Sequence, residues 1–281
     1  FSAGFLGLLH MEITQERLER EFDIDLITTA PSVEYKLRLA TKDYSKIENI
    51  NVANIDDDGM LHIRSAADYP DQTLIDEVQE PWVKLEILTP EKYIGGLMDL
   101  AQSHRGIYKS MVYLTDQQIQ GSKHVTLEYE IPTSEIITNF FDQLKSASQG
   151  YASMDYNFFE YRIADVVKVG VMLNYETVEA LSFVTHRENA EAMGRETVKK
   201  LKELIPRQNF KVPIQATIGG KVIARETLDA FRKDVTAKLY GGDISRKKKL
   251  LSKQKKGKKR MKMVGRVEVP KDVFIRALKL D

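Results

Sequence analysis

The sequence has no cysteine among its 281 residues, which excludes disulfide bonds, thiolate metal sites and cysteine nucleophiles. Long apolar runs are absent too, and none approaches the roughly 18 residues that a membrane-spanning helix needs. The amino-terminal FSAGFLGLLHMEI has neither an initiator methionine nor a basic region, so it does not resemble a signal peptide. We therefore expect residues upstream of Phe1 in the intact protein, and the composition is compatible with a reducing cytosol.

Recognisable catalytic and metal-binding patterns are also absent. The five histidines, at positions 10, 62, 104, 124 and 186, are scattered, and no two have the i, i+4 spacing of a helical metal site. The Gly-x-Ser-x-Gly elbow of serine hydrolases does not occur. We accordingly assign no catalytic, cofactor-binding or metal-binding residue in this chain.

One short motif is similar to a phosphate loop. Residues 218–221 read Ile-Gly-Gly-Lys, but Gln215 stands where that motif has its first glycine, and Val222 where it has Ser or Thr. We interpret the two glycines as a turn between a strand and a helix. The sequence therefore predicts that this chain does not bind GTP by itself.

Acidic residues are missing from one stretch in which basic residues are concentrated. Between Arg246 and Lys262, eleven of seventeen residues are Lys or Arg and none is Asp or Glu, although the whole chain has a formal net charge of only +1. Removing these eleven from the 42 basic residues leaves 31 against 41 acidic residues, a net −10 for the rest. An acidic body with one basic segment indicates a localised contact with a polyanion.

Periodicity along the chain predicts an α+β fold with more than one domain. Residues 4–22 have the apolar spacing of an amphipathic helix, and SVEYKLRLA alternates like a half-buried antiparallel strand. We expect residues 1–40 to be part of a first α+β domain. Residues 41–80 are predicted to be a connecting segment with a hairpin turn at Asp58-Gly59.

Residues 81–162 are predicted to be a second domain. Their order of strand, helix, strand, strand, helix, strand is that of the ferredoxin-like split βαβ arrangement. The second helix of this unit is expected to begin at a Thr133 cap. Its predicted core stripe comprises Ile137, Phe140, Phe141 and Leu144.

Residues 163–281 are predicted to be a carboxyl-terminal α+β domain with a basic helix and loop. A capping box of Thr185 with Glu188 is expected to start one helix, and residues 227–242 to form another. After the basic stretch we expect a strand at 263–269 and a short final helix.

The basic stretch itself is predicted to be ordered. Asp243 can cap a helix that starts at Ile244, and Ile244 and Leu251 share the face that would dock it. Gly257 is expected to end this helix, so that Lys258–Lys262 would continue as a loop. The cations would then lie on a helix and loop between ordered elements rather than on a tail.

These cations allow four interpretations: a solvated basic face, a membrane-surface contact, a nuclear-import signal and a nucleic-acid contact. The docking face lacks Trp or Phe to insert into a membrane. Counterion release from a polyanion would offset the repulsion among clustered cations, which favours nucleic acid. Because lysine dominates and no aromatic residue is interleaved, the contact is predicted to be with phosphates, and structured RNA fits this mode.

Four long stretches of the chain have a recognisable pattern: GFLGLLHMEITQERLEREFDIDLITTAPSVEY, SASQGYASMDYNF, IPRQNFKVPIQATIGGKVIARETL and RKDVTAKLYGGDISRKKKLLSKQKKGKKRMK. They resemble elongation factor 4, the LepA family of translational GTPases. The resemblance covers essentially the whole chain apart from 41–80 and 115–124. The last two stretches are specific to this family, whereas the unit at 81–162 resembles the domain V that elongation factor G also carries.

The resemblance implies a domain arrangement and a set of cofactors. This chain would comprise the end of domain III, an α/β sandwich, followed by all of domain V and the carboxyl-terminal domain special to the family. The intact protein, a GTP hydrolase, would also have a GTPase domain and a β-barrel domain II. GTP and Mg²⁺ would bind in that GTPase domain, and this chain would hold no cofactor.

The resemblance further implies partners and a site. The family acts on the ribosome, promoting back-translocation or rescuing mistranslocated complexes, so large-subunit rRNA and tRNA would be the partners of a monomeric, cytoplasmic protein of a bacterium or organelle. It also allows for peripheral association with the inner membrane. The implied RNA-binding residues are Arg232, Lys233, Lys238, Arg246, Lys247, Lys248, Lys249, Lys253, Lys255, Lys256, Lys258, Lys259, Arg260 and Lys262.

Two other hypotheses stay open from the residues alone. The chain could be a free-standing RNA-binding module without a GTPase partner, or an enzyme whose site has no sequence signature. A phosphate-loop motif encoded upstream of Phe1 would favour the translation factor, whereas a start codon just before Phe1 would favour the module.

Overall fold

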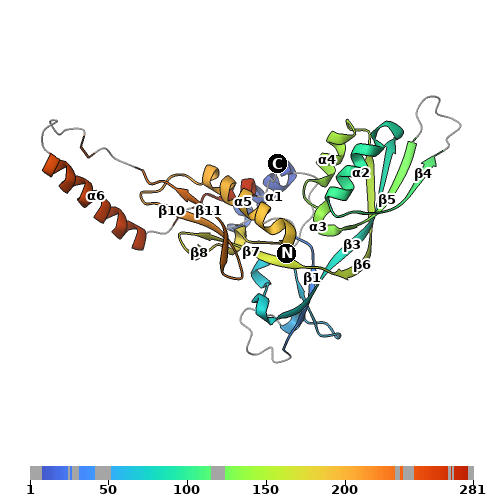
Figure 1. Cartoon of the computed structure of the whole chain (residues 1–281), viewed down its shortest axis with the longest axis horizontal. Coiled ribbons are helices and arrows are strands. Elements are labelled where there is room, and N and C mark those ends of the chain that lie inside the picture. The colour runs from blue at the N-terminus through green and yellow to red at the C-terminus, as the bar shows by residue number, and fades with distance from the viewer. Residues whose placement is uncertain are drawn as a thin grey trace.

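The computed structural model (Figure 1) describes residues 8–24, 26, 32–41, 52–114, 124–231, 235–236, 244–264, 267 and 269–277. Two antiparallel sheets with helices packed on them confirm the α+β fold class that the sequence predicts. The amino-terminal helix α1 spans Leu8–Phe22. Figure 1 shows the sheets side by side along the long axis, with one helix, α6, projecting beyond the second sheet.

The first sheet has its strands in the order β2-β1-β3-β5-β4, and β6 pairs with the opposite edge of β3. Its strands are β1 (Tyr35–Leu39), β2 (Met60–Ile63), β3 (Ile75–Pro90), β4 (Ile107–Leu114), β5 (His124–Pro132) and β6 (Ser153–Ile163). Short 3₁₀ turns lie at Val52–Asn54, Ala66–Asp68, Gln72–Leu74 and, as η5, Glu91–Tyr93.

The ferredoxin-like unit is built on the last four strands of this sheet. Helices α2 (Ile94–Ser103), α3 (Thr133–Ile136) and α4 (Phe140–Ala147) complete the order β3-α2-β4-β5-α3/α4-β6. The pairings give the spatial order β6-β3-β5-β4, as the split βαβ arrangement requires. Its core contains the fully buried side chains of Leu85, Ile87, Leu97, Ala101, Leu127, Ile131, Phe140 and Leu144.

Two predictions for the second helical region are wrong. Thr133 does not cap a helix with its side chain, because its hydroxyl donates to the Pro81 carbonyl oxygen at 3.0 Å. Phe141 is 45% exposed rather than part of the core. The expected single helix is interrupted after Ile136 and starts again at Phe140, which turns Phe141 away from the sheet.

β3 links this unit to the amino-terminal strands. Its first residues pair with β1 and its later residues with β5, so the sheet is continuous across the domain boundary expected at residues 80 and 81. Upstream, the turn at Asp57–Gly59 places Ile55 opposite Leu61, where the sequence has the predicted hairpin signal. Gly59 has a φ of 75°, which glycine adopts without strain.

The second sheet has the order β11-β10-β7-β8, with β9 pairing to the first half of β7. The strands are β7 (Val166–Leu173), β8 (Glu176–Thr177), β9 (Phe183–His186), β10 (Val212–Ile218) and β11 (Lys221–Leu228), with the 3₁₀ turn η6 at Glu179–Leu181. Helix α5 (Arg187–Leu204) covers β10 and β11 and contacts α7 (Lys271–Ala277). Gly194 permits this close approach, since an added Cβ would lie 2.8 Å from Ile223 Cδ1.

Three local predictions in this region are wrong. Thr185 is not a capping residue: α5 begins after His186 without a side-chain cap, and the Thr185 hydroxyl donates to the sulfur of Met193. The glycines 219 and 220 form a turn between two antiparallel strands, not between a strand and a helix. The segment expected as a helix from residue 227 instead starts inside β11, is not helical at 229–231, and has bends at 235–236; its other residues lie outside the described ones.

Candidate nucleic-acid interface

The basic segment is one continuous helix, α6, from Ile244 to Val264. The prediction that Gly257 ends the helix is therefore wrong, as is that of a loop at Lys258–Lys262. A single glycine inside a helix costs only about 1 kcal/mol, and the lysines, arginine and methionines around it are good helix formers. The strand expected at 263–269 is wrong at its described residues. Met263 and Val264 are helical, and Val267 and Val269 pack against the core of the second sheet but are not in a strand.

One face of α6 is partly covered. The half-buried residues are Leu250, Leu251, Gln254, Gly257 and Lys258. Their spacing of i, i+1, i+4, i+7 and i+8 defines a single helical stripe. Leu251 lies on this stripe, whereas Ile244, which was predicted to share its face, is 67% exposed at the start of the helix.

The predicted cations fall into three groups. Those with exposed side chains on α6 are Arg246, Lys247, Lys248, Lys249, Lys253, Lys255 and Lys256. Lys259, Arg260 and Lys262 have helical backbone in α6, and their side chains lie outside the described part. Arg232, Lys233 and Lys238 lie outside the described residues altogether.

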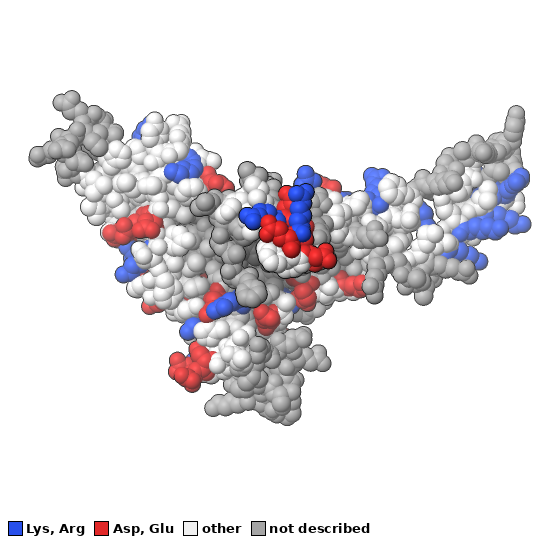
Figure 2. Space-filling model, turned by 180° about the vertical axis from the view of Figure 1, so that it is seen from behind, with Lys and Arg blue, Asp and Glu red and all other residues white. Residues whose placement is uncertain are grey.

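Most of the exposed lysines of α6 have no ion pair with a described carboxylate. Within the described ranges, no ion pair joins Lys247–Lys249, Lys253, Lys255 or Lys256 to a carboxylate. Figure 2 shows the same distribution: blue side chains cluster at the end formed by α6, whereas the red carboxylates lie on the body. The helix is about 30 Å long at 1.5 Å per residue. It therefore presents a long surface of one sign, which is the arrangement that a chain of phosphates complements.

Lys258 differs from its neighbours because it is used within the protein. Its ammonium group donates to the Phe231 carbonyl oxygen at 2.6 Å, and the Phe231 amide donates to the Gln208 carbonyl at 2.9 Å. The Phe231 backbone is thus tied to α6, and its side chain is 60% exposed. Sequence reasoning missed this contact, because Phe231 and Lys258 are 27 residues apart in the chain.

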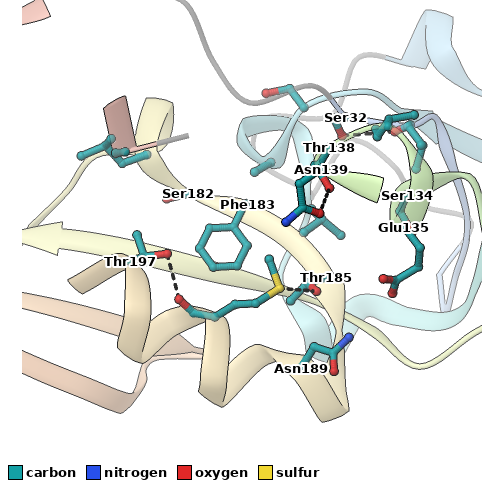
Figure 3. Close-up of a pocket in the computed structure, with 18 of the residues that line it drawn as sticks. Ser32, Ser134, Glu135, Thr138, Asn139, Ser182, Phe183, Thr185, Asn189 and Thr197 are labelled. Atoms are coloured by element: carbon teal, nitrogen blue, oxygen red, sulfur yellow. Dashed lines mark hydrogen bonds between the residues drawn. The ribbon is translucent and has the colours of Figure 1, made fainter. Parts of the chain in front are cut away.

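A cleft of about 730 Å³ is the other candidate site (Figure 3). It lies between the amino-terminal strand β1, the helices α3 and α4, and the β9–α5 region. Several of its polar groups bond within their own segment: the Thr197 hydroxyl donates to the Met193 carbonyl at 2.8 Å, and that of Thr138 to the Asn139 side chain at 3.4 Å. Figure 3 shows these groups on opposite walls around Phe183, without a converging polar set.

The most buried ionisable groups of the cleft, His104 and Glu135, take part in ion pairs. His104 Nδ1 lies 3.3 Å from Glu135 Oε2, and Arg105 Nη1 lies 3.5 Å from Glu135 Oε1. Burial alone would raise the pKa of the Glu135 carboxyl, but the hydrogen bond from His104 and the charge of Arg105 hold that pKa below its ordinary value. The hydrogen bond to Glu135 raises the pKa of His104. A charged, fully paired carboxylate is unsuited to general acid catalysis, and the described residues contain no cluster that could hold a metal ion.

No helix in the described ranges is long and apolar enough to cross a membrane. The basic face of α6 is the strongest candidate site in the described part of the chain.

The two halves of the chain match different families. Residues 77–171, which include the ferredoxin-like unit, match the family described as elongation factor G C-terminus, and residues 173–279, which include α6, match GTP-binding protein LepA C-terminus. These matches define the class as a translation factor.

Comparison with curated proteins identifies the family. The chain is 55% identical over 281 residues to elongation factor 4 of Acetivibrio thermocellus, covering 100% of this chain and 43% of the relative. It is 53% identical over 279 residues to elongation factor 4 of Mycoplasmopsis pulmonis, covering 99% and 43%. A chloroplastic translation factor GUF1 homolog of Micromonas pusilla is 52% identical over 281 residues, covering 100% and 37%. The chain belongs to the elongation factor 4 (LepA) family, as its resemblance predicts, and spans less than half the length of these relatives.

Proposed function

We propose that this chain is the ribosome- and RNA-contacting part of an elongation-factor-4-type translation factor, and that α6 binds RNA phosphates. The observation that carries the proposal is the unbroken helix α6, whose exposed lysines have no carboxylate partner within the described residues. Membership of the elongation factor 4 family favours the ribosome as the source of that RNA.

The physical basis is the release of counterions from RNA. Each lysine that neutralises a phosphate frees a condensed cation, so affinity is high at low salt and falls steeply as salt rises. Such contacts fix position and orientation but carry little sequence information. The acidic body, at a net −10 without the eleven cations, disfavours phosphates over most of its surface and so favours binding at the projecting helix.

Within the intact factor, tRNA and large-subunit rRNA are the proposed partners, and back-translocation or rescue of mistranslocated ribosomes is the proposed event. GTP hydrolysis with Mg²⁺ is assigned to a GTPase domain elsewhere in such a factor. Binding of this chain to RNA would then position the factor on the ribosome, while the GTPase domain would hydrolyse the nucleotide.

A charge-neutralisation variant of α6 tests the proposal. The four substitutions are Lys248→Gln, Lys253→Gln, Lys255→Gln and Lys256→Gln. Each replaced lysine is exposed, so we expect the fold to be retained. The plot of log affinity for purified ribosomes or tRNA against log salt concentration should become shallower by about 3 units, because four phosphate contacts are lost.

A matched control removes the same number of exposed cations from other helices. The control substitutions are Arg17→Gln, Arg20→Gln, Arg195→Gln and Lys202→Gln, at side chains that are 70%, 78%, 71% and 45% exposed. This variant should keep the salt dependence of the wild-type chain. Equal effects of the two variants, or none from the α6 variant, would overturn the assignment of the contact to α6.

A further inference from the structure

A second cluster of cations lies at the far end of the molecule from α6, and it contains aromatic rings. Tyr93 in η5 and Tyr151 before β6 are stacked, with ring centroids 6.0 Å apart and planes at 21°. The Lys92 ammonium lies 4.5 Å from the centroid of Tyr93 and 5.2 Å from that of Tyr151. Tyr151 is 66% exposed, so its side chain is accessible to solvent beside a cation.

The backbone that presents Tyr151 is held firmly. Gln149 and Gly150 have φ values of 52° and 85°, in the left-handed region that follows many helices. The Gly150 amide donates to the Lys145 carbonyl at 2.7 Å, and the Lys145 ammonium donates to the Ala152 carbonyl at 2.7 Å. The Tyr93 hydroxyl donates to Gln149 Oε1 at 2.9 Å, which ties the two loops together. The exposed ring is therefore pre-positioned rather than free to collapse.

The cluster continues along α4. Phe141 is 45% exposed, and the Lys145 ammonium lies 5.3 Å from its ring centroid. We call Lys92, Tyr93, Phe141, Lys145 and Tyr151 the aromatic–lysine surface. Each of its three rings has a lysine over it, whereas α6 itself contains cations without any aromatic residue.

We propose that the aromatic–lysine surface binds an unpaired nucleotide of RNA, whose base stacks on Tyr151 and whose phosphate pairs with Lys92. The proposal deepens the proposed function by naming a second RNA contact of a different kind. Every base has a π face that stacks on an exposed aromatic ring, and an adjacent ammonium group matches the flanking phosphate. Sequence-tolerant stacking of splayed-out bases is the usual way in which proteins recognise RNA loops. An apolar protein partner would instead have to desolvate the lysines.

The two contacts predict different RNA preferences. α6 binds phosphates and should not distinguish a paired duplex from an unpaired loop. The aromatic–lysine surface needs an accessible base, so it should bind a loop and ignore a duplex. Figure 1 places α6 and the α2–α4 face at opposite ends of the long axis, so each can be altered without touching the other.

The test measures binding of the full chain to two RNAs, a hairpin with an unpaired purine loop and a fully paired duplex with the same number of phosphates. Tyr151→Ala should weaken binding to the loop RNA by about 5- to 150-fold, the range for losing one stacked base, and leave the duplex unaffected. Tyr151→Phe keeps the ring and should bind both RNAs like the wild type. Lys92→Gln should make the salt dependence for the loop RNA shallower by about 0.7 units.

Each outcome decides between the two proposals. If Tyr151→Ala binds both RNAs like the wild type while the α6 variant loses affinity, the aromatic–lysine surface is not an RNA site and the function proposed for α6 stands. An equal loss on both RNAs would also overturn base stacking. If Tyr151→Ala weakens binding to ribosomes but leaves the affinity for both RNAs unchanged, the aromatic–lysine surface contacts a protein partner instead. If the wild-type chain binds neither RNA, both proposals fail.

Discussion

Replacing Arg105 with alanine should destabilise the ferredoxin-like unit by about 3 kcal/mol. Arg105 follows α2 and reaches Glu80 of β3, whose side chain is only 1% exposed. Arg105 Nη1 donates to Glu80 Oε2 at 3.2 Å, and Nη2 donates to Oε1, so the pair is bidentate. Removing one partner of a buried pair leaves an uncompensated charge, which costs about 3–5 kcal/mol. The low end applies here because Arg105 itself is 22% exposed.

Replacing Arg105 with glycine separates the effect of the lost charge on stability from the effect of the backbone conformation. Arg105 has a φ of 62°, in the left-handed region where a side chain is disfavoured, and the next residue, Gly106, donates its amide to the Ala101 carbonyl at 2.8 Å. Arg105→Gly removes the backbone strain as well as the charge, at some cost in unfolded-state entropy. It should therefore be roughly 0.5–1 kcal/mol less destabilising than Arg105→Ala.

Urea unfolding monitored by the fluorescence of Trp82 is a suitable assay, since it is the only tryptophan in the sequence and lies buried in β3 close to Glu80. The double variant Glu80→Leu with Arg105→Met removes both charges and should recover most of the lost stability. A single Arg105→Ala variant within about 0.5 kcal/mol of the wild type, the range typical of surface changes, would refute the reasoning. So would a double variant less stable than the single one.

Two further predictions concern His62 and Gly257. His62 Nδ1 lies 2.6 Å from Glu34 Oε1, and its Nε2 lies 2.9 Å from Asp56 Oδ2. Burial alone would lower the pKa of His62, but these hydrogen bonds outweigh the effect of burial and raise that pKa. The stabilisation by protonated His62 is complete below the unfolded pKa of about 6.5 and is lost as pH rises through the folded pKa. The urea midpoint of the wild type should therefore fall as pH rises through the folded pKa, and His62→Gln should make that fall smaller. A dependence of the midpoint on pH that His62→Gln leaves unchanged would contradict this pairing. Gly257→Ala should raise the helical content of α6 in circular dichroism and stabilise it by about 1 kcal/mol, because an added Cβ meets nothing within 4 Å; a loss of helicity would mean that Gly257 is required.

The ferredoxin-like unit was predictable because local signals and tertiary packing agree in it. Alternation in β3 and β5 places Leu85, Ile87 and Leu127 on one face, and the structure buries that face under α2 and α4. The helix predicted at 227–242 is wrong at its start for the opposite reason. Leu228 pairs with Val212 across the β10–β11 hairpin, and this tertiary pairing outweighs the local preference for helix.

The sequence predicted where the cations of the candidate site lie, but not the length of the helix that carries them. Composition alone located the cations, because no acidic residue interrupts them. Whether Gly257 breaks the helix depends on a difference of about 1 kcal/mol, which sequence patterns do not resolve. The sequence did not predict the aromatic–lysine surface, because its periodicity places Phe141 in the core, whereas the structure leaves it 45% exposed. Only the break between α3 and α4 and the turn at Gln149 bring these rings to the surface with their lysines.

The division of charge between α6 and the body has a consequence for specificity. If the eleven cations were spread over the surface, the chain would attract any RNA in many orientations. Gathered on a helix that projects from a body of net −10, they make that helix the most favourable place for a run of phosphates to approach. Phosphate contacts at α6 would then set the position of the chain, and a base stacked on Tyr151 at the other end would set its orientation. A chain with both contacts should therefore bind an RNA that offers a duplex and a loop at the matching distance more tightly than either part alone, because the second contact forms at a high effective concentration.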